Sequence, residues 1–153
     1  MAMELYVFSD RQLSSMSAWQ QAINAAGFPV GLPTRFPFDW ENRVLPAEFR
    51  GRATTFESKL CDANEAMTES PDIDFGHPWK HGLVLRWGSD TYAGAATYLA
   101  GSAYAQATGG VLLDCEEGKI ISATRAAEIG FDLERSIPMI EAALRKAVEQ
   151  FRK

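Results

Sequence analysis

One segment limits the possible folds of this chain more than any other: the run from Thr91 to about Thr108, TYAGAATYLAGSAYAQAT. Ser89 or Asp90 can cap its start, and a stripe at helical spacing predicts one buried face, formed by Tyr92, Ala96, Leu99, Ala103 and Ala107. Alanine, serine and glycine make this helix thin, although an interior glycine costs up to ~1 kcal/mol relative to alanine. A thin helix can lie close to a sheet, which predicts strands beside it.

Strand patterns flank this helix on both sides. HGLVLRWG, residues 81–88, has three consecutive apolar residues and is typical of a central strand. Gly109 and Gly110 predict a helix cap, and VLLDC, EEG and KIIS then predict a buried strand, a turn and a returning strand. A phosphate-binding loop requires glycines before a helix, whereas here they follow one.

The N-terminal half continues the alternation of strands and helices. We expect a strand at 3–8, a helix from Ser14 or Ser15 to Ala26 that ends at Gly27, and an edge strand at 28–32. Residues 33–52, rich in proline and aromatic residues, are expected to be irregular. A strand at 53–62 and a polar connection at 64–78 complete this half.

Two helices are expected at the C-terminal end. A short helix is predicted at 123–129. Ser136 would cap a second helix with Pro138 in its first turn. This helix is expected to be amphipathic and to continue to the end of the chain, with an apolar face that includes Ile140, Leu144 and Phe151.

This order of elements predicts one α+β domain over residues 1–153. We expect a mixed β-sheet of about five to six strands, with helices packed mainly on one face and a C-terminal amphipathic helix. An apolar fraction of 46% and a charged fraction of 23% are ordinary for a soluble globular protein.

The charge and the cysteine content exclude several classes of function. A net charge of -5 argues against nucleic-acid binding, which normally needs a clustered basic surface. No apolar run approaches the ~18 to 20 residues of a membrane span. Two cysteines, Cys61 and Cys115, are too few for a disulfide framework, so we expect reduced thiols and a cytoplasmic location.

No motif specifies a reaction, and we predict no catalytic residue, metal site or cofactor. Cys115 follows Asp114 and precedes two glutamates, which should raise the pKa of its thiol. His77 and His81 have the spacing of a helical zinc pair, but Pro78 between them favours a loop. The alternative hypothesis is a small-ligand-binding protein or enzyme whose pocket combines His77, His81, Arg50, Arg52 and Glu57.

Acidic residues are concentrated in one segment, residues 57–74. Its acids are Glu57, Asp62, Glu65, Glu69, Asp72 and Asp74, and Lys59 is its only base, so the segment carries a net charge of -5, equal to that of the whole chain. Such a block is usually a solvated loop, but it also suits a docking surface for a basic partner. Trp40, predicted to be an exposed anchor, and Trp79 are expected to supply the area that the partner buries, and Glu116 and Glu117 are expected to extend the acidic surface.

A chain with these features resembles, in outline, the small acidic immunity proteins of bacterial polymorphic toxin systems, including contact-dependent and type VI effectors. The resemblance implies a non-catalytic protein that neutralises a cognate protein toxin by occluding its basic surface or active site. The expected partners are therefore that toxin, with no nucleic acid and no membrane. A further hypothesis is a homo-oligomeric accessory protein whose aromatic segment, within residues 33–52, forms the interface between copies.

Overall fold

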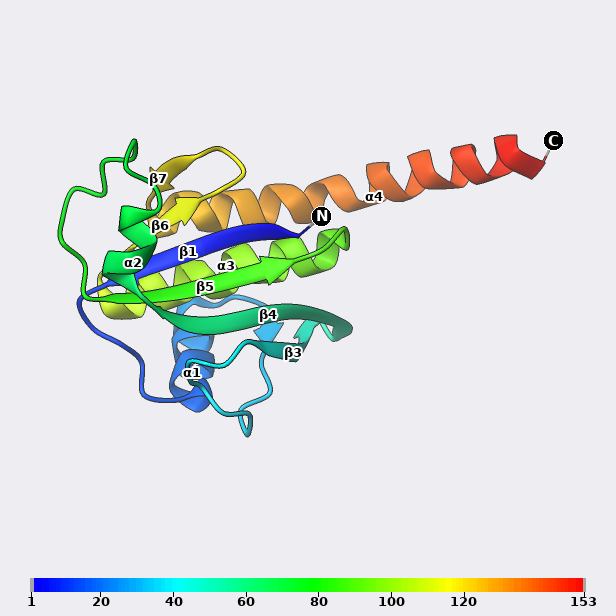
Figure 1. Ribbon diagram of the computed structural model, residues 1–153. Coiled ribbons are helices and arrows are strands. Elements are labelled where there is room, and N and C mark those ends of the chain that lie inside the picture. Colours follow the sequence, from blue (N-terminus) through cyan, green and yellow to red (C-terminus); the bar gives the residue numbers. More distant parts are fainter. Residues whose placement is uncertain (1, 153) are drawn as a thin grey trace.

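An antiparallel sheet forms the centre of the computed structural model, which describes residues 2–152 (Figure 1). Within those residues the sheet has seven strands in the order β2-β3-β4-β5-β1-β6-β7. The strands are β1 (Met3–Ser9), β2 (Val30–Gly31), β3 (Arg43–Phe49), β4 (Arg52–Asp62), β5 (His81–Trp87), β6 (Val111–Asp114) and β7 (Lys119–Ile121). The helices are α1 (Met16–Ala26), α2 (Ala63–Thr68), α3 (Thr91–Thr108) and α4 (Ala123–Arg152). The predicted α+β class is confirmed.

The sheet differs from the mixed sheet of five to six strands that the sequence predicts. Helix α3 connects β5 to β6, and a helical crossover normally joins parallel neighbours. Here β1 lies between these two strands and is antiparallel to both, so no neighbouring pair is parallel. The order of elements along the chain does not reveal this insertion of the first strand.

The seventh strand lies inside the segment that the sequence predicts to be irregular. Strand β3 includes Pro46, which pairs in register with Thr55 of β4. Strand β2 reaches only Glu48 and Phe49, so Pro46 lies where β3 forms the edge of the sheet. A proline is tolerated at an edge because its missing N–H interrupts no inner ladder. Helix α2 is likewise an addition, within the segment predicted to be a polar connection.

Helix α3 has the predicted bounds, with Asp90 as its N-cap and Gly109 as its left-handed C-cap at φ 72°. Its buried surface is wider than the single stripe predicted, because 14 of its 18 residues are buried, although Ala107 of that stripe is exposed. The sheet lies on one side of it, and α1 and α4 pack against its other sides. A Cβ on Gly101 would approach Leu5 and Leu112 at 3.1 and 3.2 Å, so this glycine allows the helix its close approach to the sheet.

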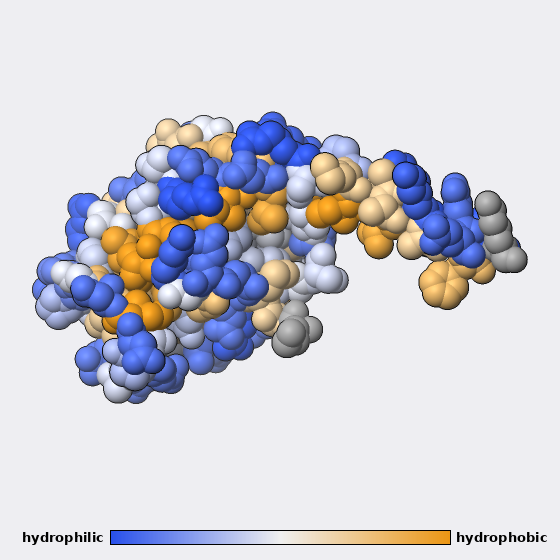
Figure 2. Space-filling model, turned by 90° about the horizontal axis from the view of Figure 1, so that it is seen from above, coloured by the Kyte–Doolittle hydropathy of each residue, from blue (hydrophilic) through white to orange (hydrophobic). Residues whose placement is uncertain are grey.

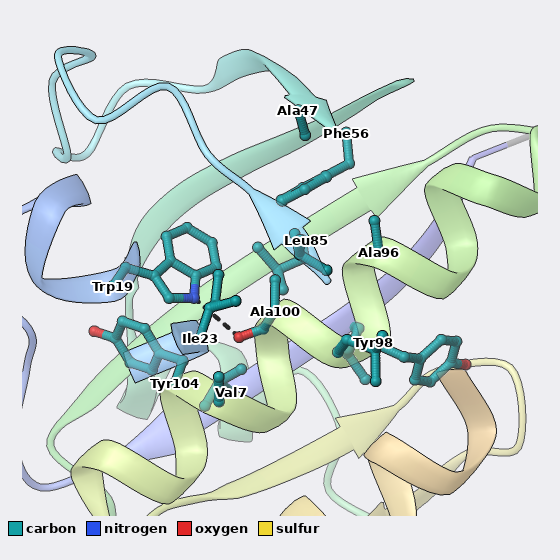
Figure 3. Close-up of a cluster of buried hydrophobic side chains, with 14 of the residues drawn as sticks. Val7, Trp19, Ile23, Ala47, Phe56, Leu85, Ala96, Tyr98, Ala100 and Tyr104 are labelled. Carbon is teal, nitrogen blue, oxygen red and sulfur yellow. Dashed lines mark hydrogen bonds between the residues drawn. The ribbon is translucent and has the colours of Figure 1, made fainter. Parts of the chain in front are cut away.

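The main core lies between the sheet and these helices (Figure 3). Alternate side chains of each strand point into it, including Leu5 and Val7 of β1 and Phe56 and Leu60 of β4. Trp19 of α1 is fully buried there, and its indole Nε1 donates a hydrogen bond of 2.9 Å to the carbonyl of Ala100 (Figure 3). The predicted helix α1 is confirmed, with Ser15 and Gly27 as its caps.

Helix α4 is one continuous helix, so the prediction of two helices is wrong. The Ser136 hydroxyl does not cap a new helix, because it donates a hydrogen bond of 2.7 Å to the Leu133 carbonyl. Pro138 lies inside the helix. Residues 123–137 pack beside α3, while residues 138–152, which we call the arm, extend away from the domain (Figure 1).

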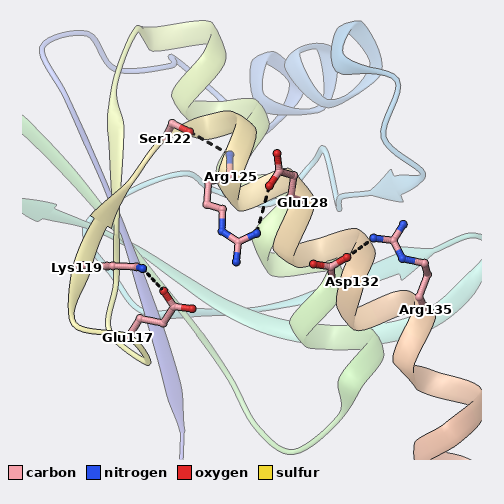
Figure 4. Close-up of polar contacts among 7 residues, drawn as sticks. All are labelled: Glu117, Lys119, Ser122, Arg125, Glu128, Asp132 and Arg135. Carbon is pink, nitrogen blue, oxygen red and sulfur yellow. Dashed lines mark hydrogen bonds and ion pairs between the residues drawn. The ribbon is translucent and has the colours of Figure 1, made fainter.

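Figure 4 shows the polar side of the packed half of α4. Ser122 accepts a hydrogen bond from the backbone N–H of Arg125 at 3.0 Å, which satisfies part of the helix start. Arg125 pairs with Glu128 at 3.2 Å, and Arg135 pairs with Asp132. These exposed pairs mark the side of α4 that faces away from α3.

Candidate functional site

The face of the sheet opposite α3, which we call the outer face, is only partly covered. Helix α2 and the segment that follows it pack over Phe8 and Leu113 of this face, with Ala63 at the centre of the contact. The strands otherwise present alternating side chains there, among them Tyr6 and Val84. Two hollows of about 320 and 350 Å³ lie on the uncovered part.

The two hollows adjoin, since Tyr6, Ala66 and Glu69 line both of them. The remaining residues of the first are Asn42, Lys59, Cys61, Asp62, Glu65, Val84 and Arg86. The remaining residues of the second are Ala2, Glu4, Ser70, Leu113, Cys115 and Glu116. Four predicted partner-binding residues, Asp62, Glu65, Glu69 and Glu116, therefore come together on one surface.

Charge is distributed unequally between the hollows. Lys59 and Arg86 offset the carboxylates of the first hollow. The second is lined by Glu4, Glu69 and Glu116 with no lysine or arginine among its lining residues, although Arg86 lies 3.5 Å from Glu4. The second hollow is therefore the more acidic.

Glu4 is not among the site residues that the sequence predicts. It alternates with core residues in β1, so its place on the outer face follows from the strand pattern. Its proximity to Glu69 and Glu116 follows only from the strand order, because β1 lies between β5 and β6. No local signal brings these three side chains together.

Burial is the main cause of raised pKa values for three groups in the hollows, and nearby carboxylates add to it. Burial, followed by the charge of Glu4, raises the pKa of Tyr6 to about 12. Burial also raises the pKa of Cys115 to about 11, with Glu4 and Asp114 adding to the effect. Burial raises the pKa of Cys61 to about 11 as well, although Lys59 opposes the shift. Both thiols are therefore protonated near neutral pH, which does not suit a nucleophile.

The other predicted partner-binding residues lie outside the two hollows. Asp74 is engaged locally, because its Oδ1 accepts a hydrogen bond from the Gly76 N–H, and Asp72 lies in the same exposed segment. Glu57 accepts a hydrogen bond of 2.6 Å from Asn42. Glu117 forms an ion pair with Lys119 at 2.9 Å, which lowers the pKa of its carboxyl group.

The two predicted aromatic anchors differ from each other. Trp79 is half-buried in the cluster around Phe8, and its Nε1 donates a hydrogen bond to the Phe75 carbonyl at 3.2 Å. It is therefore part of the packing under the segment after α2. Trp40 has 57% of its surface exposed and remains available to a partner, but it lines neither hollow.

The alternative pocket predicted from the sequence is not formed. His81 lies opposite Asp62 at one end of β4, whereas Arg50 and Arg52 lie at the other end. A strand of 11 residues separates these positions by about 30 Å at ~3.3 Å per residue. His77 pairs instead with Asp10 at 2.6 Å.

The arginines of that predicted pocket have other contacts. The Arg50 guanidinium pairs with Glu134 of α4, and that of Arg52 stacks over the Tyr92 ring at 3.9 Å. In residues 2–152 no group of three or more His, Cys, Asp or Glu side chains is arranged to hold a metal ion. Among the helices of the same residues, none has the length and apolarity to cross a membrane.

Comparisons with protein-family models, with curated proteins and with solved structures find no match to this chain.

Proposed function

We propose that this protein is a non-catalytic binding protein of the immunity type, which neutralises a cognate bacterial toxin in the cytoplasm. In this proposal the two hollows of the outer face bind a basic surface of the toxin and keep its substrate away. The observation that carries the proposal is the convergence of three carboxylates around the second hollow, from Glu4 in β1, from Glu69 at the C-cap of α2 and from Glu116 in the turn between β6 and β7.

The chemistry of these hollows suits protruding lysine or arginine side chains. A carboxylate accepts charge-assisted hydrogen bonds from either, and arginine can bind one through two parallel bonds. Tyr6 and Leu113 supply an apolar surface on which the stem of such a side chain can lie. Surrounding carboxylates would also speed the encounter with a basic partner, an effect that salt weakens.

The experiment is affinity capture from a lysate of the source organism, at about 50 mM and about 500 mM salt, because screening separates charge-driven from apolar binding. Wild-type protein is compared with the pair Glu69→Lys and Glu116→Lys. The matched control reverses two exposed acids of α4, Glu128→Lys and Asp132→Lys. We expect the wild type and the control to retain one specific protein at low salt and the outer-face variant to lose it.

The captured protein is then expressed in a bacterial host with and without this chain. Growth arrest by the captured protein alone, relieved by wild-type chain and not by the outer-face variant, supports the proposal. Equal capture by all three forms places the binding surface elsewhere. A captured protein that is harmless to the host removes the immunity role.

A further inference from the structure

The apolar face of α4 does not end where its packing against α3 ends. In the packed half this face contains Ala126, Gly130, Leu133 and Ile137, at steps of four, three and four residues. The same progression continues along the arm through Ile140, Leu144, Val148 and Phe151. These four side chains are 39%, 61%, 51% and 93% exposed. The arm therefore presents the same kind of face as the packed half, without a neighbour to cover it.

The N-terminal end of α3 lies beside the first residues of the arm. The two helices are antiparallel, because Leu133 lies against Gly94 and Gly130 against Leu99. Near the start of α3, the Tyr92 hydroxyl donates a hydrogen bond of 3.2 Å to Glu141. Beyond Glu141 the arm extends past the N-terminal end of α3. Figure 2 shows apolar side chains gathered along one side of the arm. The missing neighbour is a helix antiparallel to α4 and in line with α3.

Such a neighbour would stabilise the arm. Most of the stability of helices in proteins comes from a packed apolar face, and the apolar face of the arm is largely exposed. Pro138 at the start of the arm weakens the helix, since it removes one backbone hydrogen bond.

We propose that the neighbour is the arm of a second copy of this chain, packed antiparallel about a two-fold axis. The axis passes between positions 145 and 146. Ile140 of each copy then lies beside Phe151 of the other, and Leu144 lies beside Ala147 and Val148 of the other. The apolar stripe of one arm can pack against the same stripe of the second arm, because a two-fold interface uses the same patch on both subunits.

The root of the arm complements its tip in shape and charge. A hollow of about 210 Å³ opens beside Ile140, and Tyr92 and Ile137 also line it. Phe151 of the second copy lies at its mouth in this register, so this 93% exposed ring packs against the apolar part of the hollow, formed by Tyr92, Ile137 and Ile140. Arg152 follows Phe151 in the chain and approaches Asp90 and Glu141, which outnumber the single base of that hollow, Arg52.

Analytical ultracentrifugation of the full chain tests this proposal. Two short helices make an interface at the small end of the known range, for which we expect a Kd of about 10 μM. The sedimentation coefficient should rise from that of a monomer at about 1 μM to that of a dimer at about 300 μM. Leu144→Asp and Phe151→Asp should each weaken the dimer by at least about tenfold, because each places a charge in the apolar interface.

Met139 provides a matched control. It is 76% exposed and lies on the same arm, but about 140° around the helix from the centre of the stripe. Met139→Asp should leave the Kd unchanged. Hydrogen exchange adds a second readout, since the amides of residues 141–152 should be protected at the high concentration and nearly unprotected at the low one.

Three results would overturn the proposal. The first is a monomer at every concentration, and the second is a dimer that Leu144→Asp does not weaken, since its interface then lies elsewhere. The third is ordering of the arm on anionic phospholipid vesicles without self-association, since the stripe then binds a membrane surface.

Discussion

Arg50 in the turn between β3 and β4 forms a two-pronged ion pair with Glu134 of α4, 84 residues further along the chain. Its Nη2 lies 2.9 Å from Oε1 of Glu134, and its Nε pairs with the other carboxylate oxygen. The contact fixes the outer hairpin of the sheet to the helix that carries the arm. Arg50 achieves this with a φ of +51°, a conformation that costs a residue with a side chain more than it costs glycine.

This pairing predicts an unusual order of stabilities at position 50. Arg50→Ala should destabilise the protein by about 0.5 to 1 kcal/mol, because it loses an ion pair that is partly exposed to solvent while the backbone conformation stays the same. Arg50→Gly should cost less than Arg50→Ala, since glycine relieves the backbone. Urea unfolding followed by circular dichroism measures the difference. Equal loss in the two variants would show that the backbone at Arg50 is unstrained.

A second prediction concerns the contact of α3 with α4. A Cβ at Gly130 would lie 2.9 Å from Cγ of Leu99 and 3.2 Å from the Ala95 carbonyl. Gly130→Ala should therefore lower the free energy of unfolding by about 1 to 3 kcal/mol, although alanine is the better helix former. Gly88→Ala is the control, because a Cβ there meets no atom within 4 Å. A Gly130→Ala protein of unchanged stability would mean that α3 and α4 separate easily.

Stability should fall as the solution becomes alkaline. Cys61 and Cys115 have pKa values near 11 in the folded protein against an ordinary 9.0, so the unfolded chain loses these protons first. Between pH 9 and about 11 the folded state binds more protons, and the free energy of unfolding therefore decreases with pH. Urea titrations at several pH values measure the slope. Cys61→Ala with Cys115→Ala should reduce that slope, whereas an unaltered slope would assign it to other groups.

The second hollow can be checked without any partner. The charges of Glu4 and Glu69 contribute to the raised pKa of Tyr6. Glu4→Gln with Glu69→Gln should therefore lower the pKa of Tyr6, as followed by ultraviolet absorbance with Tyr6→Phe to assign the signal. Glu57→Gln is the control, since Glu57 lines neither hollow. An unchanged Tyr6 pKa in the Glu4→Gln, Glu69→Gln variant would show that these carboxylates lie away from the Tyr6 ring.

Local signals account for most elements of this fold. The caps of α1 and α3, and the consecutive apolar residues of β5, could be identified from sequence because each depends on near neighbours. The continuity of α4 could not be predicted from sequence, because Ser136 and Pro138 locally favour the start of a new helix. Packing against α3 overrides that preference. Strand β3 escaped prediction for a similar reason, as Pro46 is acceptable only where β2 is too short to reach it.

The candidate site was harder to predict than the fold. Asp62, Glu65 and Glu69 are neighbours in sequence, and their grouping follows from the capping of α2 by Asp62. Glu4 and Glu116 join them only because β1 and β6 are adjacent in the sheet. The pocket expected from His81 and Arg52 failed on the same ground, since the length of β4 separates them. Distances across the sheet depend on strand order, which single residues do not encode.

The burial of α3 divides the chain into positions that can vary and positions that cannot. A helix with 14 of its 18 residues buried has almost no side chain that can change without disturbing a neighbour. Mutational scanning should therefore find α3 the least tolerant segment, with the outer face and the arm the most tolerant for folding. New binding specificities can then evolve on those two surfaces while the interior sequence stays fixed. The closely packed small side chains of α3 therefore restrict sequence change to the surfaces that lie away from this helix.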